Sequence, residues 1–110
     1  MPTARNAKGI DLMAYNSDAT KVRTVQVKTL SSRSDVPLGG KLHNLMGDFF
    51  IVCRLSQSQS PECFVLTPSE VRELAVRNKK STSGQVSYWL PVRKYENEGF
   101  VENWGRIGLT

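Results

Sequence analysis

The segment DFFIVCRL, residues 48–55, is the feature that most constrains the fold of this chain. It is a continuous apolar run of strand length, without the alternation of a strand that has one face in solvent. Such a run is typical of a central strand that is buried on both faces. The chain has 110 residues, enough for one domain with a modest core. We therefore expect a single domain, residues 1–110, organised around this strand.

Two more strands are predicted upstream, joined by a polar turn. Residues 9–15 alternate between apolar and polar side chains, residues 16–20 favour a turn, and residues 21–30 are rich in Val and Thr. With the turn centred on residues 17–19, antiparallel pairing sets Asp11 roughly opposite Gln26. Lys28 shares the face of Gln26, because side chains two residues apart in a strand point the same way. An acid, an amide oxygen and an ammonium group would then converge on one patch of the sheet.

The middle of the chain predicts a loop, a strand and a helix. Residues 31–40, SSRSDVPLGG, contain Pro and two Gly residues and favour a loop without regular structure. Residues 62–66 form a short strand that completes a hairpin with the buried one. A helix then begins after Thr67, which has a capping-box glutamate three residues later, and the basic residues Arg77 to Lys80 complement its C-terminus.

The end of the chain is less regular. Residues 86–90 predict a last strand, which Pro91 stops and which would suit an edge position. Residues 93–110 are weakly helical, with apolar side chains spaced to dock one face on the core. The expected class is α/β in the broad sense, more narrowly α+β, with a central sheet of about five strands and one clear packing helix.

Charge and hydropathy indicate the kind of partner. The net charge is +5, and residues 1–55 hold eight basic and four acidic residues. A basic half suits a polyanion such as nucleic acid, although a mild excess can also serve solubility alone. No apolar run approaches the roughly 18 residues that a membrane span needs, so no membrane partner is expected. The N-terminal segment lacks the apolar core of a signal peptide, and we expect a cytoplasmic location.

Other candidate site residues lie outside the hairpin. Arg33, Lys41 and His43 flank the loop at residues 31–40, where they could contact phosphate or simply be solvated. Cys53 and Cys63 lie in expected strands and are predicted to act as small hydrophobic side chains. A disulfide and a zinc site are the alternatives, although His43 is the only histidine that could help to bind zinc.

The three hairpin residues suit metal chemistry. A hard divalent cation prefers oxygen ligands, which a carboxylate and an amide carbonyl supply, and a neighbouring lysine can position or deprotonate a water molecule. The alternative is an exposed polar face with a chance ion pair, as in many antiparallel sheets.

The order of these residues resembles a known family. GIDL, followed fifteen residues after its acid by VQVKT, resembles the PD-(D/E)XK nuclease superfamily, in particular its Mrr-like branch with glutamine in place of the second acid. The resemblance is strongest over residues 5–30 and extends loosely through DFFIVCRL, CFVL and TPSEV. It implies a restriction-endonuclease-like mixed sheet, a Mg²⁺ or Mn²⁺ cofactor and DNA as substrate. It also implies that Asp11, Gln26 and the main-chain carbonyl of Val27 bind the metal, and that Lys28 is the catalytic lysine.

The chain departs from the family pattern in two ways. Gln26 replaces the usual glutamate, which lowers the negative charge that holds a metal. The family fold also begins with a helix that often bears another acid, whereas only ten residues precede Asp11 here and none of them is acidic. We therefore expect the domain to lack this N-terminal helix, which another chain could supply or the C-terminal segment could replace. A second copy of the chain, as a homodimer, or another partner chain is expected to cover that position. The main hypothesis is a metal-dependent DNA endonuclease or nuclease-derived domain. The alternatives are a non-catalytic nucleic-acid-binding or oligomeric assembly module on the same scaffold, and a structural interaction protein.

Overall fold

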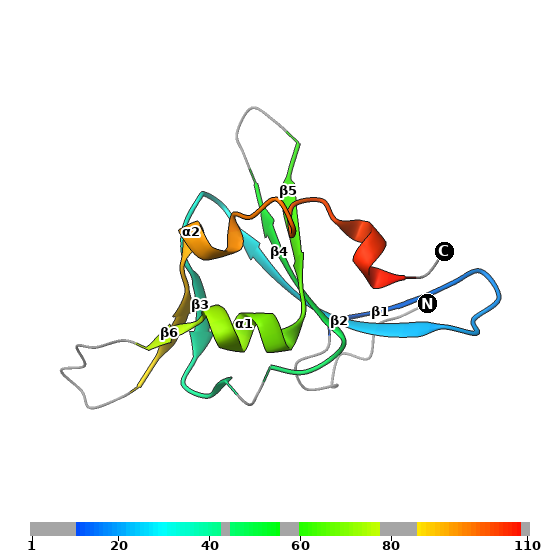
Figure 1. The fold of residues 1–110 in the computed structure, drawn as a ribbon, viewed down its shortest axis with the longest axis horizontal. Helices are drawn as coiled ribbons and strands as arrows, with labels where there is room; N and C mark the ends of the chain where they lie inside the picture. Colours follow the sequence, from blue (N-terminus) through cyan, green and yellow to red (C-terminus); the bar gives the residue numbers. More distant parts are fainter. Residues whose placement is uncertain (1–10, 43–44, 56–59, 78–85, 109–110) are drawn as a thin grey trace.

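The computed structural model describes residues 11–42, 45–55, 60–77 and 86–108. These residues form a four-stranded sheet with strand order β1-β2-β4-β5 and a three-stranded sheet with order β3-β7-β6 (Figure 1). The strands of the first sheet are β1 (Leu12–Tyr15), β2 (Val22–Leu30), β4 (Phe49–Arg54) and β5 (Glu62–Leu66). Those of the second are β3 (Val36–Gly39), β6 (Val76–Arg77) and β7 (Tyr88–Leu90). The helical elements are α1 (Pro68–Leu74), α2 (Val92–Tyr95) and the 3₁₀ helix η2 (Trp104–Ile107).

The four-stranded sheet is mixed. Strand β2 pairs antiparallel with β1 and parallel with β4, and β4 pairs antiparallel with β5. A parallel pair needs a crossover connection, and here the chain between β2 and β4 contains β3, which belongs to the second sheet. The expected α+β class, with a mixed sheet and one helix of seven residues, is confirmed.

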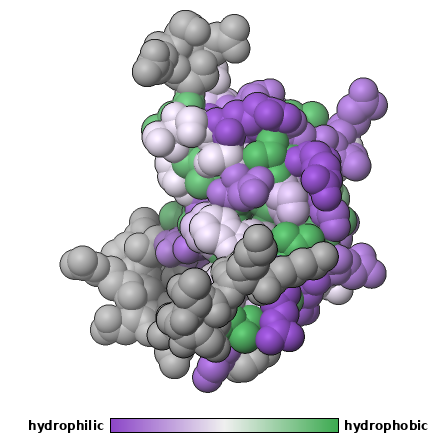
Figure 2. All heavy atoms as spheres, turned by 90° about the vertical axis from the view of Figure 1, so that its left-hand side faces the viewer, coloured by the Kyte–Doolittle hydropathy of each residue, from purple (hydrophilic) through white to green (hydrophobic). Residues whose placement is uncertain are grey.

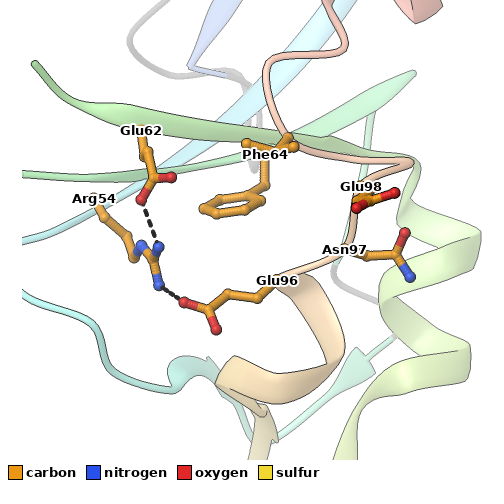
Figure 3. Close-up of a pocket in the computed structure, with 7 residues that line it drawn as sticks. Arg54, Glu62, Phe64, Glu96, Asn97 and Glu98 are labelled. Atoms are coloured by element: carbon orange, nitrogen blue, oxygen red, sulfur yellow. Dashed lines mark hydrogen bonds and ion pairs between the residues drawn. The ribbon is translucent and has the colours of Figure 1, made fainter.

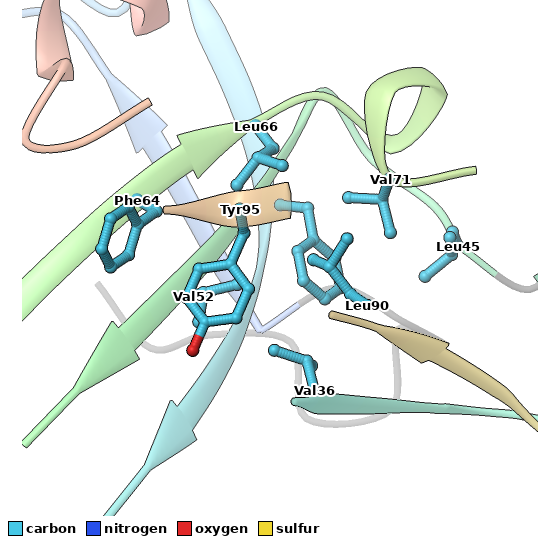
Figure 4. Packing of buried hydrophobic residues seen from close by; sticks show 9 residues of the cluster. Val36, Leu45, Val52, Phe64, Leu66, Val71, Leu90 and Tyr95 are labelled. Carbon is cyan, nitrogen blue, oxygen red and sulfur yellow. The ribbon is translucent and has the colours of Figure 1, made fainter. Parts of the chain in front are cut away.

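Strand β4 is buried on both faces, as its apolar run predicts. Phe50 and Val52 contribute to one hydrophobic cluster, and Phe49 and Ile51 to another. The first cluster lies between the sheet and the elements α1, β3, β7 and α2, which contribute Val71, Val36, Leu90 and Tyr95 (Figure 4). We call this side of the sheet the α1 face.

The opposite side, which we call the η2 face, carries the second cluster. Val25, Phe49, Ile51 and Val65 form it, and Ile107 of η2 packs against it. The C-terminal segment therefore docks on the core as expected. Trp104, the first residue of η2, remains 44% exposed. Among the described residues, no helix has the length and apolar character needed to cross a membrane.

Helix α1 begins where the sequence predicts. The Thr67 hydroxyl accepts from the N–H of Glu70 at 3.2 Å, and the Glu70 carboxylate accepts from the N–H of Thr67 at 2.9 Å, which completes the capping box. The helix ends at Leu74, and the following residues form β6. The prediction that the helix extends towards its basic cluster is therefore wrong at Arg77, because this residue pairs with β7 instead. Lys79 and Lys80 lie outside the described residues.

Two other expectations are corrected by the second sheet. Residues 31–40 are not wholly irregular, because β3 forms within them. Pro37 is tolerated there because β3 is an edge strand, and the register shifts between Pro37 and Gly39. Strand β7, expected at an edge, is central in this sheet, and Pro91 instead precedes the first residue of α2. The expected absence of an N-terminal helix concerns residues 1–10, which lie outside the described residues.

Candidate functional site

A tight polar turn shapes the β1–β2 hairpin. The N–H of Ala19 donates to the Asn16 carbonyl at 3.0 Å, and the Asn16 side-chain oxygen accepts from the N–H of Lys21 at 2.9 Å. Asp18 accepts from the hydroxyl and the N–H of Thr20, which lowers the pKa of its carboxyl group below the usual value. The predicted turn is therefore present, and it sets the register of the two strands.

The regular pairing of the hairpin ends just before Asp11. Leu12 pairs with Val25 and Met13 with Thr24, and no pairing joins Asp11 to Gln26. The main-chain N–H of Asp11 donates to the carbonyl of Val25 at 2.9 Å, so Asp11 and Leu12 both face Val25, as in a β-bulge.

Gln26 and Lys28 both project on the α1 face. Their register partners on β4 are Phe50 and Val52, two residues of the cluster on that face. Both side chains are half-buried. The Gln26 side-chain oxygen Oε1 is buried and has no hydrogen-bond partner among the described residues. A buried amide oxygen without a partner is costly, which makes it the most unusual polar atom of the described sheet.

The Asp11 carboxylate lies just beyond the start of β1, against the edge of β2. Its Oδ2 accepts from the main-chain N–H of Val27 at 2.7 Å, and the residue is exposed. In a β-strand the N–H and C=O of one residue point to the same side, so the Val27 carbonyl also faces the β1 side of β2. The hairpin thus brings the Asp11 carboxylate into contact with Val27, whose neighbours along β2 are Gln26 and Lys28.

The donor set can be tested against a hard divalent cation. The orphaned oxygen of Gln26, the Asp11 carboxylate and the Val27 carbonyl are the types of ligand that Mg²⁺ accepts. However, no group of three or more His, Cys, Asp or Glu side chains that could hold a metal occurs in the described ranges. The predicted ligand positions therefore offer one carboxylate and two neutral oxygens.

The basic residues near the crossover differ from one another. The Arg33 guanidinium forms two hydrogen bonds with the Glu96 carboxylate, at 2.7 and 2.8 Å, which also raise the pKa of Arg33. A phosphate would have to compete with that ion pair. Lys41 is exposed, and His43 lies outside the described residues.

A separate charged cluster surrounds a cavity of about 220 Å³ on the α1 face (Figure 3). Arg54 reaches both Glu62, at 2.6 Å, and Glu96. Its guanidinium lies over the rings of Phe64 and Tyr95, at 4.9 and 5.7 Å from their centroids. The side chain of Arg54 is only 11% exposed, so the carboxylates and rings replace the water it has lost.

The ionisation of this cluster follows from its contacts. The hydrogen bonds from Arg33, the larger contribution, and from Arg54 lower the pKa of Glu96 to about 2. Burial alone would lower the pKa of Arg54, but its hydrogen bonds to Glu96 and Glu62 outweigh that effect and raise it. The cluster is therefore ionised at neutral pH, and its opposite charges largely cancel each other.

The charged cluster around Arg54 was not predicted from the sequence. A signal existed for one pair, because Arg54 ends β4 and Glu62 begins β5, so a hairpin places them opposite each other. Glu96 comes from the far end of the chain, and no local pattern predicts its contact.

The surface around these elements is mostly polar. Figure 2 shows the side of the molecule that carries β6, β3 and α2, where hydrophilic residues cover much of the coloured surface and apolar residues form separate small patches.

The β1–β2 hairpin exposes apolar side chains. Leu12, Tyr15 and Val22 are exposed by 43–47%.

Comparison with known proteins gave no match: no family model, no curated protein and no solved structure is similar to this chain.

Proposed function

We propose that this chain is a metal-dependent phosphodiester hydrolase domain that acts on DNA. The observation that carries the proposal is the orphaned Oε1 of Gln26, one residue before Val27, whose N–H donates to the Asp11 carboxylate. A buried oxygen without a donor is a poor structural element but a good ligand for a cation. The resemblance of the hairpin to the PD-(D/E)XK pattern supports the same conclusion.

The roles follow from the chemistry of each group. Asp11, Gln26 and the Val27 carbonyl would hold Mg²⁺ or Mn²⁺. When bound, the cation would offset the charge of the scissile phosphate. Lys28 orients the attacking water and donates a hydrogen bond to the phosphate oxygen as charge develops there. The mildly basic N-terminal half attracts the polyanion, with exposed Lys41 available for a phosphate contact.

The test is nicking of supercoiled plasmid by the purified chain with Mg²⁺ or Mn²⁺. Asp11→Asn keeps an oxygen to accept from the Val27 N–H but removes the charge, and Lys28→Ala removes the ammonium group. Each should lower the nicking rate by about 10²-fold or more. Lys21→Ala is the matched control, because Lys21 is an exposed residue of the same hairpin. Equal nicking by all four proteins would refute the assignment.

A second candidate is a non-catalytic DNA-binding or assembly module on the same scaffold. The observation that favours it is the single carboxylate at the site, since one acid gives a cation little charge to bind. Calorimetry that detects no Mg²⁺ or Mn²⁺ binding, together with DNA binding that weakens steeply with salt, would select this function.

A second copy of the chain is the partner that we propose for either function. The exposed apolar side chains of Met13, Tyr15 and Val22 lie on one face of the hairpin, because Tyr15 pairs with Val22 and Met13 is two residues before Tyr15, and they would be covered in a homodimer. Sedimentation of the wild type and of Tyr15→Glu tests this, since a monomeric wild type would reject it.

A further inference from the structure

Two cysteines face each other on neighbouring strands of the η2 face. Cys53 of β4 and Cys63 of β5 are direct register partners, and both are free thiols. Both are half-buried and pack against the cluster of that face. They lie on the side of the sheet opposite to Gln26 and Lys28, so they are not part of the candidate site.

The backbone shows which kind of antiparallel pair this is. The N–H of Cys63 donates to the Glu102 carboxylate at 2.6 Å, and the Cys63 carbonyl accepts from the N–H of Glu102 at 2.7 Å. Both main-chain groups of Cys63 therefore point away from β4. Cys53 and Cys63 are thus a non-hydrogen-bonded pair, in which the Cα atoms are about 4.5 Å apart and the side chains are closest.

That spacing suits a covalent bond. Disulfides span Cα separations of about 4.4–6.8 Å, so the two strands can be joined with little backbone movement. The neighbouring residues hold the pair in place: β4 is paired on both edges, and the C-terminal segment fixes the outer edge of β5 at Glu102.

We propose that Cys53 and Cys63 are a redox modification site, which a low-molecular-weight disulfide such as oxidised glutathione converts into a cross-strand disulfide. One protein thiolate attacks a glutathione sulfur and releases one glutathione thiolate. The second protein thiolate then attacks the protein sulfur of the mixed disulfide and releases the second glutathione. The two protons of the protein thiols end on the two glutathione thiols, and the protein loses two electrons, which the glutathione disulfide gains.

The surroundings determine how this pair behaves. Burial, together with hydrogen bonding and charge from Cys53, raises the pKa of the Cys63 thiol to about 12. Because the thiolate is the nucleophile, oxidation is slow at neutral pH and accelerates as the pH rises. The same environment does not stabilise the thiolate form, so the disulfide, once formed, resists reduction.

The test measures disulfide formation in glutathione redox buffers, with acid quenching, alkylation and intact mass. The wild type should lose the mass of two hydrogen atoms without gaining glutathione. Its equilibrium constant for this oxidation should be roughly 10²-fold larger in the folded chain than in urea, because the fold holds the sulfurs together. Cys53→Ser and Cys63→Ser should give only free thiol or mixed disulfide.

Three results would overturn the proposal. They are thiols that stay reduced in the folded wild type under conditions that oxidise it in urea, accumulation of the mixed disulfide in the folded wild type, and covalent dimers on a non-reducing gel. None of these readouts depends on plasmid nicking, so this proposal and the proposed function can fail independently.

Discussion

Replacing Gln26 by methionine should stabilise the chain. The two side chains are unbranched and similar in length, so the shape of the core on the α1 face is largely kept. The substitution removes a buried oxygen that has no hydrogen-bond partner among the described residues. Such an atom has lost its water without compensation, which costs about 1–3 kcal/mol. We expect Gln26→Met to raise the free energy of unfolding by about 1–2 kcal/mol.

Urea denaturation measures this gain. With an unchanged slope, the midpoint should rise by roughly 0.5–1 M, and the Tm by at least about 4 °C. Thr24→Val is the matched control on the same strand. The Thr24 hydroxyl donates to the Asp48 carboxylate at 3.3 Å and accepts from the N–H of Asp48 at 3.1 Å. The free energy of unfolding of this variant should therefore fall by about 1 kcal/mol. Opposite signs for the two variants separate an unpaired polar group from a paired one.

A comparison of the wild type with Gln26→Met also tests binding of the cation. Mg²⁺ should raise the Tm of the wild type, because a ligand that binds only the folded state stabilises it, and should leave the Tm of Gln26→Met nearly unchanged. A loss of 1 kcal/mol or more in Gln26→Met without metal would refute the reasoning, since it would mean that the oxygen has a partner in solution.

Two other predictions concern the fold around the site. Glu96→Gln should lower the urea midpoint at pH 6, because Arg54 loses a charged partner. The pKa of Glu96 is lowered to about 2 in the folded state, so its stabilising effect is present above its ordinary pKa of about 4.5 and is lost as the pH falls towards 2. The difference between wild type and variant should therefore shrink between pH 6 and pH 2, and a constant difference would contradict this mechanism. Thr67→Ala should cost about 1 kcal/mol through loss of the helix cap, measured by urea denaturation, whereas Thr67→Ser should retain most of it.

The parts of the fold that the sequence predicts are those with local signals. The turn is held by hydrogen bonds between residues at most five apart, and the capping box joins Thr67 to Glu70. The apolar run of β4 can be recognised as a buried strand without knowing which strands pair with it. Once the turn is placed, the pairing of β1 with β2 follows by counting. For this reason the approach of Asp11 to β2 could be predicted, whereas the bonding of its N–H to Val25, the partner of Leu12, could not.

The second sheet could not be predicted because its pairing is not local. Strand β3 pairs with β7, whose partners lie 49 to 54 residues later, and Pro37 and Gly39 obscure its pattern. Strand β6 ends the helix early because Val76 and Arg77 gain partners on β7, which helix propensity does not anticipate. The Glu96 cluster was missed for the same reason, since Arg33 and Arg54 lie 63 and 42 residues before it.

The pairing of β2 explains why its polar groups are a better basis for a site than the basic residues of the crossover. Thr24 and Leu30 direct their carbonyls to the β4 side, where they accept from Asp48 and Leu55, while Val25 and Val27 bond to Asp11 on the other side. A strand held on both edges cannot rotate or slide to give a buried side chain a new partner. The orphaned oxygen of Gln26 therefore cannot be relieved by a small adjustment of the backbone. Groups on such a strand are preorganised for a ligand more precisely than groups on a connection, so we expect substitutions on β2 to change cation binding and substitution of Lys41 to change DNA affinity alone.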